Sequence, residues 1–161
     1  MKKFICPLIL IVAITHIACN SEPPENPPLN SINWIEYTHP QLGYFIRYPD
    51  NYSIHENDSD VLFRLDGYPV VVINYVTRQE ARDRGLWIKH KPVESLSVDN
   101  IHWQKFVYNH YDGPFGMRTV TYATTFREKW LGLEFRTSGE LDEVHMEIMN
   151  SLKFPGLLMD R

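Results

Sequence analysis

The chain has 161 residues, a formal net charge of −4 and two cysteines, Cys6 and Cys19. This length is sufficient for one domain with its own hydrophobic core. A mildly acidic chain lacks the basic surface that nucleic acids bind, so we exclude that class of function and expect no nucleic-acid partner.

The first 18 residues have the order of a bacterial export signal. Two lysines give a positive start, and residues 4–18 form an almost wholly apolar run. This run is shorter than the ~20 residues of a permanent membrane-spanning helix. Small Ala18 precedes Cys19, as lipoprotein processing requires, although His16 stands where the processing motif usually has leucine. We expect residues 1–18 to be a lipoprotein signal peptide; an ordinary cleaved signal and an uncleaved anchor are the alternatives.

Cleavage before Cys19 would leave that residue, acylated, as the only cysteine of the mature chain. An exported domain would then have no disulfide, no cysteine nucleophile and no cysteine-ligated zinc. Loss of the two lysines would change the formal charge from −4 to −6. We therefore expect a protein held to a membrane of the bacterial cell envelope by its lipid anchor, with its domain outside the cytoplasm.

A proline-rich tether follows the cysteine. Four of the twelve residues after Cys19 are proline, and almost none is apolar. Such a segment favours extended polyproline II, which at ~3.1 Å per residue would span on the order of 35 Å. We expect residues 19–31 to be the lipidated cysteine and a tether, which acts as a semi-rigid spacer or as a flexible leader. Residues 32–154 are the predicted domain, and 155–161 a C-terminal tail.

The domain is predicted to consist mainly of strands. Leu131, Leu133 and Phe135 alternate with small or polar residues, which is typical of a strand buried on one face. The run Pro69–Val76 is apolar on both faces, as expected of a central strand covered on both sides. Asp99-Asn100 is a two-residue turn signal that predicts a hairpin. Further strands are predicted at Val61–Leu65, Val93–Val98, Ile101–Tyr108 and Met117–Arg127.

Two capping boxes predict helices. Thr77–Glu80 is the first, and Gly85 offers a stop, which predicts a short polar helix over Arg78–Arg84. Thr137–Glu140 is the second, and it predicts a helix over Gly139–Ser151. This helix should pack on the sheet through apolar residues that recur at helical spacing, Leu141, Val144, Ile148 and Leu152.

Two short motifs resemble a known family. Leu42–Pro49 (LGYFIRYP), followed by Tyr52, resembles the "LGYsfrYPdgW" opening of PsbP-like domains, with Tyr52 in the usual tryptophan position. Asn150–Phe154 resembles their closing motif, and the likeness covers most of Tyr37–Phe154 in element order. The resemblance implies an α+β fold in which an antiparallel β-sheet is flanked by helices, an α/β/α sandwich. The family includes photosystem II subunits and bacterial lipoproteins and is mostly a scaffold for protein contacts, and the fold by itself assigns no function.

The sequence carries no motif of a catalytic or metal site. His102 and His110 are eight residues apart on one predicted strand, too far to share a metal directly. Glu56–Asp60 lacks the glycine-containing loop of a calcium site, and we expect a solvated turn there. His145 falls at the edge of the last helix's apolar stripe, where a local hydrogen bond is expected. No nucleotide-binding or serine-elbow motif is present, so we predict no enzymatic activity, no cofactor and no metal.

One aromatic loop is the predicted contact surface. Residues 108–116 combine aromatic and turn residues, a composition typical of recognition surfaces. The candidate protein-contact residues are Tyr108, His110, Tyr111 and Phe115. In the alternative, two of these aromatic side chains fold back as a lid on the sheet edge. The sequence thus favours a lipid-anchored, non-catalytic binding or assembly module for an envelope protein. The alternative is a small-ligand carrier with a pocket between sheet and helices, a space that the bulky aromatic residues are expected to fill.

Overall fold

The computed structural model describes residues 28–98, 101–110 and 117–154, with His110 described by its backbone alone. The signal peptide, Cys19, most of the tether and the tail at 155–161 lie outside the described residues. Of the described helices, none is long and apolar enough to cross a membrane. The elements in chain order are η1 (Leu29–Ser31), β1 (Trp34–Thr38), β2 (Phe45–Pro49), β3 (Ser53–Glu56), β4 (Asp60–Leu65), β5 (Tyr68–Val76), α1 (Arg78–Asp83), η2 (Trp87–Lys89), β6 (Glu94–Val98), β7 (Ile101–His110), β8 (Met117–Phe126), β9 (Lys129–Thr137) and α2 (Glu143–Ser151).

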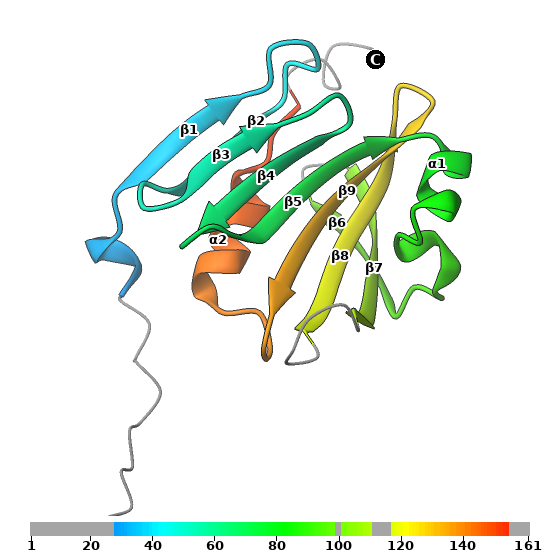
Figure 1. Cartoon of the computed structure of the whole chain (residues 1–161). Helices are drawn as coiled ribbons and strands as arrows, with labels where there is room; N and C mark the ends of the chain where they lie inside the picture. Colours follow the sequence, from blue (N-terminus) through cyan, green and yellow to red (C-terminus); the bar gives the residue numbers. More distant parts are fainter. Residues whose placement is uncertain (1–27, 99–100, 111–116, 155–161) are drawn as a thin grey trace, which may run out of the picture.

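A seven-stranded antiparallel sheet forms the centre of the domain, in the order β3-β4-β5-β9-β8-β7-β6, with β1 and β2 as a separate hairpin (Figure 1). The predicted hairpin around residues 99–100 is confirmed, since β6 and β7 pair antiparallel from Val98 and Ile101 outward. The β8–β9 turn is closed by Arg127 and Glu128, whose φ angles of 47° and 66° are left-handed. Such a two-residue turn matches the right-handed twist of the strands that it joins.

One face of the sheet carries the larger core. The β1–β2 hairpin and α2 pack over it, and buried side chains from β2, β9 and α2 meet there, including Ile46, Leu133 and Ile148. Tyr44, Ile46 and Tyr48 alternate along the chain at β2, and all three are buried. Backbone hydrogen bonds between Phe45 and Lys153 fasten β2 to the end of α2.

The opposite face carries a second, smaller core beneath α1 and η2. Its members include Val76, Ala81, Trp87, Phe106 and Ala123. The indole ring of Trp87 lies against Gly132 of β9, where a β-carbon would leave it no room. Strand β9 is therefore buried on both faces, and the prediction that it is buried on one face only is wrong.

The first predicted helix is confirmed. Thr77 and Glu80 form the capping box of α1. The helix ends at Asp83, one residue before the predicted end. Gly85 then adopts a left-handed φ of 70°, and the amides of Gly85 and Leu86 close a Schellman motif on the carbonyls of Arg82 and Ala81.

The second helix begins later than predicted. Helix α2 starts at Glu143, and its cap is Asp142 with His145, not the predicted box at Thr137–Glu140. The reason is a long-range contact, because the Glu140 carboxylate is paired with Arg118 of β8 and does not fold back on a helix start. The apolar stripe of α2 faces the sheet as expected.

Candidate functional site

The predicted contact loop is only partly described. Tyr111 and Phe115 lie outside the described residues, as does the side chain of His110. Tyr108 does not belong to a loop, because β7 continues to His110. Its side chain is buried, so the assignment of Tyr108 to an exposed contact loop is wrong.

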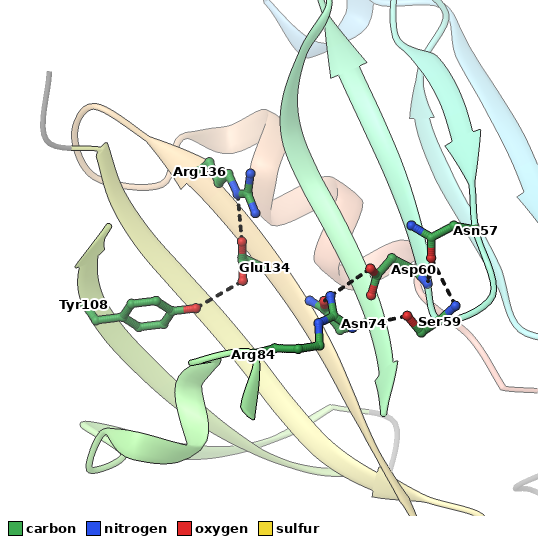
Figure 2. Close-up of polar contacts among 8 residues, drawn as sticks. All are labelled: Asn57, Ser59, Asp60, Asn74, Arg84, Tyr108, Glu134 and Arg136. Carbon is green, nitrogen blue, oxygen red and sulfur yellow. Dashed lines mark hydrogen bonds and ion pairs between the residues drawn. The ribbon is translucent and has the colours of Figure 1, made fainter. Parts of the chain in front are cut away.

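Tyr108 instead belongs to a buried polar cluster. Its hydroxyl donates a hydrogen bond of 3.1 Å to Oε2 of Glu134, and Nε of Arg136 donates one of 2.7 Å to Oε1. Figure 2 shows Glu134 between these two side chains. The Glu134 side chain is 1% exposed, so both its carboxylate oxygens need such donors. Burial raises the pKa of Tyr108, and the Glu134 carboxylate raises it further.

A second polar cluster joins α1 to the sheet. The Arg84 guanidinium donates hydrogen bonds to Asp60 of β4 at 2.7 Å, to Asn74 of β5 at 3.2 Å and to Ser59 at 3.2 Å (Figure 2). Asn57 accepts hydrogen bonds from the amides of Ser59 and Asp60 and so closes the β3–β4 turn. The predicted turn is present, but Asp60 is drawn into an ion pair and its side chain is only 12% exposed. The role of the cluster is therefore structural: it attaches the end of α1 to strands β4 and β5.

A groove of about 600 Å³ with a partly apolar lining lies between α2 and strands β7 and β8. Its floor contains Val107, Val120 and Tyr122, and Leu141 and Met146 line the α2 side. We call it the β7–β8 groove and define it by these residues together with Val93, Lys105, Arg118 and Glu140.

Two exposed apolar side chains line the β7–β8 groove. Val93 is 62% exposed and Met146 39%, although both are large apolar residues. Two basic residues, Lys105 and Arg118, also line it. Nζ of Lys105 lies 3.3 Å from Oε2 of Glu94, and the guanidinium of Arg118 is paired with the carboxylate of Glu140. The groove is therefore apolar in its middle and carries one ion pair toward each end.

A second hollow, of about 480 Å³, lies where the tether joins the domain. Ser31–Asn33 line it together with Tyr52, Leu65 and the first turn of α2, and we call it the tether-end cleft. In it, Nδ1 of His145 lies 2.6 Å from Oδ1 of Asp142, which confirms the expected local hydrogen bond. Burial raises the pKa of Tyr52, and the charge of Asp142 adds to this. The Asp142–His145 pair is the helix cap itself.

His102 meets no metal or acid–base arrangement in the described part of the chain, and the side chain of His110 lies outside it. His102 is exposed and shares a shallow hollow with Gln104, Thr124, Thr125 and Trp130, with no carboxylate in the lining. Within residues 28–98, 101–110 and 117–154, no three His, Cys, Asp or Glu side chains lie close enough to hold a metal ion.

Comparison with known proteins identifies the fold. No protein-family model and no curated protein sequence matches the chain. The solution structure of cyanobacterial PsbP (CyanoP) from Synechocystis sp. PCC 6803 superposes over 81% of this chain and 97% of its own, with a TM-score of 0.53 and 14% identity. The fold is PsbP-like.

A crystal structure from Bacteroides thetaiotaomicron VPI-5482, at 1.50 Å resolution, is similar to 74% of this chain, with a TM-score of 0.54 and 11% identity. The chain spans about half of that protein, 47% of its length. At such identities the likeness concerns the PsbP-like fold alone and carries no activity or partner with it.

Sequence reasoning missed the Glu134 cluster and the β7–β8 groove within this PsbP-like fold. Strand alternation assigned Glu134 to a solvent-facing side, because the strand alone reveals neither its contact with Tyr108 of β7 nor the cover that η2 gives to this face at Gly132. Gly132 was the available signal, since a glycine inside a strand often marks a close approach of another group. The groove had no local signal, because Val93, Val107 and Met146 come from three distant parts of the chain.

Proposed function

We propose that this protein is a lipid-anchored module of the bacterial cell envelope that binds another envelope protein and has no catalytic role. The observation that carries the proposal is the β7–β8 groove. Four large apolar side chains are exposed in the described part of the chain, and two of them, Val93 and Met146, line this one groove. Single exposed apolar residues are ordinary, whereas a group of them marks an interaction site.

The floor of the groove supports this use. Val120 and Tyr122 are nearly inaccessible at its base, and Val107 and Leu141 are half-buried. A partner side chain placed among Val93, Val107 and Met146 would remove apolar surface from water at about 25 cal/mol per Å². The exposed carboxylates of Glu94 and Glu140 would stay at the rim, as in the polar rim of protein interfaces.

The polar clusters support a non-catalytic role. The two carboxylate oxygens of Glu134 accept hydrogen bonds, one from Tyr108 and one from Arg136, and the side chain is only 1% exposed. Asp142 and His145 cap α2. Each charged group in these clusters thus has a structural explanation, and an acid–base mechanism would need groups that converge on a substrate.

Site-specific photo-crosslinking in the native envelope tests the proposal. A benzophenone side chain at position 93 or 146 should form an adduct with a protein, and the same probe at Ile35, an exposed apolar residue of β1 outside the groove, should not. The double variant Val93→Asp, Met146→Asp should abolish binding of the protein so identified to the purified lipoprotein. Equal adducts from position 35, or full binding by the double variant, would place the contact elsewhere.

A small-ligand carrier is the second candidate, and one observation favours it. The groove lies between the sheet and a helix, where that function needs a pocket, and its volume of about 600 Å³ falls within the roughly 300–1,000 Å³ of ligand sites. Native mass spectrometry of the detergent-solubilised lipoprotein distinguishes the two candidates. A small molecule that stays bound to the wild type and is absent from the Val93→Asp, Met146→Asp variant supports the carrier.

A further inference from the structure

We infer that the end of the domain where the tether joins rests on the lipid surface, with the Tyr68 side chain as its contact. The inference goes beyond the binding groove and rests on the proposed lipid anchor at Cys19. The inference specifies how the domain is oriented. The end of the sheet with the β4–β5 turn touches the membrane, and the β3–β4 turn points away from it.

Tyr68 lies close to the point where the chain enters the domain. It pairs with Leu65 across the β4–β5 turn, and Leu65 lines the tether-end cleft together with Ser31–Asn33. Figure 1 shows η1 and the β4–β5 turn at the same end of the molecule. Asp66 and Gly67 hold the turn in left-handed conformations, with φ angles of 51° and 83°.

The tether keeps this end near the membrane. Eight residues separate Cys19 from Pro28, the first described residue. Even a fully extended segment of that length reaches at most about 29 Å. Strand β4 has the β3–β4 turn at one end and the β4–β5 turn, next to Tyr68, at the other. An anchored chain therefore brings the β4–β5 turn to the lipid.

Tyr68 is strongly exposed at the end of the domain that the tether brings to the lipid. At 73%, it is the most exposed large hydrophobic side chain of the described residues. Tyrosine is favoured at membrane–water interfaces, because its ring sits among the headgroups while its hydroxyl stays hydrated. The two charged residues nearest in the chain, Arg64 and Asp66, are of opposite sign, so the contact needs no anionic lipid. Tethering makes the contact intramolecular, and a single side chain is then enough to bias the orientation.

Depth-dependent fluorescence quenching of the acylated protein tests the orientation. Signal cleavage removes Cys6 and acylation blocks Cys19, so an introduced cysteine is the only thiol to carry a dye. Two exposed turn positions form a matched pair: Asn51→Cys at the tether-end cleft, and Asp58→Cys at the β3–β4 turn. The labelled lipoproteins are placed in phosphatidylethanolamine–phosphatidylglycerol vesicles that contain a nitroxide-labelled phospholipid.

The expected result is strong quenching at position 51 and weak quenching at position 58. Tyr68→Ser should lower the ratio of the two, although the tether is unchanged, and Tyr68→Trp should restore it. Acylated mass and membrane fractionation, measured on each variant, should not change. Equal quenching at both positions in the wild type overturns the inference. A ratio that Tyr68→Ser leaves unchanged overturns the role of Tyr68 and assigns the orientation to the tether alone.

Failure of the anchor itself has a different signature. A protein that lacks acyl mass and fractionates as soluble would remove both the proposed anchor and this inference. An acylated protein without the position dependence removes the inference only.

Discussion

Replacement of Gly132 by alanine tests whether Trp87 seals the second core. An alanine β-carbon at this position would lie 2.8 Å from Cζ2 of the indole ring and closer still to Cζ3 and Cη2, whereas ordinary contacts begin near 3.4 Å. Trp87 is fully buried, so its ring can retreat only if η2 shifts with it. Overpacking of this kind costs about 1–3 kcal/mol. At a typical urea m-value, the unfolding midpoint should fall by about 1 M.

Equilibrium urea unfolding of the mature domain measures the effect, with Gly139→Ala as the matched control. Gly139 has no neighbouring atom within 4 Å of an added β-carbon and does not have a left-handed φ, so its variant should stay within about 0.5 kcal/mol of the wild type. In Trp87→Leu, which removes the clashing ring, Gly132→Ala should cost about 1 kcal/mol less than in the wild type. A Gly132→Ala variant as stable as the Gly139 control, or additive free energies in the double variant, would refute this account of the second core.

Four further predictions concern the larger core, the proposed anchor, the Glu134 cluster and His39. Leu133→Ala, at a fully buried position of the larger core, should cost roughly 2–5 kcal/mol; an unchanged denaturation midpoint would mean that the face assignment is wrong. If Cys19 carries the proposed lipid anchor, Cys19→Ala should abolish acylation and release the domain into the soluble fraction, because acyl chains would supply the membrane affinity; a variant that stays bound with its full precursor mass would indicate an uncleaved anchor. Tyr108→Phe should cost about 1–3 kcal/mol, since the buried Glu134 carboxylate loses the donor at 3.1 Å; stability equal to the wild type would contradict that role. Burial lowers the pKa of His39 from its ordinary 6.5, and its Nδ1 accepts two backbone hydrogen bonds while neutral. The unfolded chain therefore binds a proton at His39 more readily than the folded chain does. The stability that neutral His39 contributes is present above pH 6.5 and is lost as the pH falls through the lowered pKa. An NMR titration that gives His39 an unshifted or raised pKa would contradict this prediction.

Local patterns predicted the strands well, because alternation and turn residues act over a few positions. The β6–β7 hairpin, the capping box of α1 and the stop at Gly85 are all set by neighbours in sequence. The start of α2 was misplaced because Glu140 is engaged by Arg118, twenty-two positions away. A contact over that distance leaves no trace in the local sequence.

The candidate sites were harder to predict than the fold for the same reason. Glu134 is buried in contact with Tyr108 of β7, on the face of β9 where Trp87 of η2 lies against Gly132. Tyr108 looked like the start of an aromatic loop because its neighbours are turn residues, yet two more residues extend β7 beyond it. In both errors a buried side chain was predicted to be exposed, and its burial depends on tertiary packing.

The widths of the layers explain why a groove exists at β7 and β8. Seven strands spaced about 4.8 Å apart make a sheet roughly 30 Å across. On the larger core's face, the β1–β2 hairpin and the single helix α2 each cover about 10 Å. About two strands' width is therefore left without cover on that face, and there the chain places Val107 and Val120 in the floor and leaves Val93 and Met146 exposed. A domain that needed no partner would be expected to have polar side chains at these positions, so the apolar floor favours a surface that a binding partner completes.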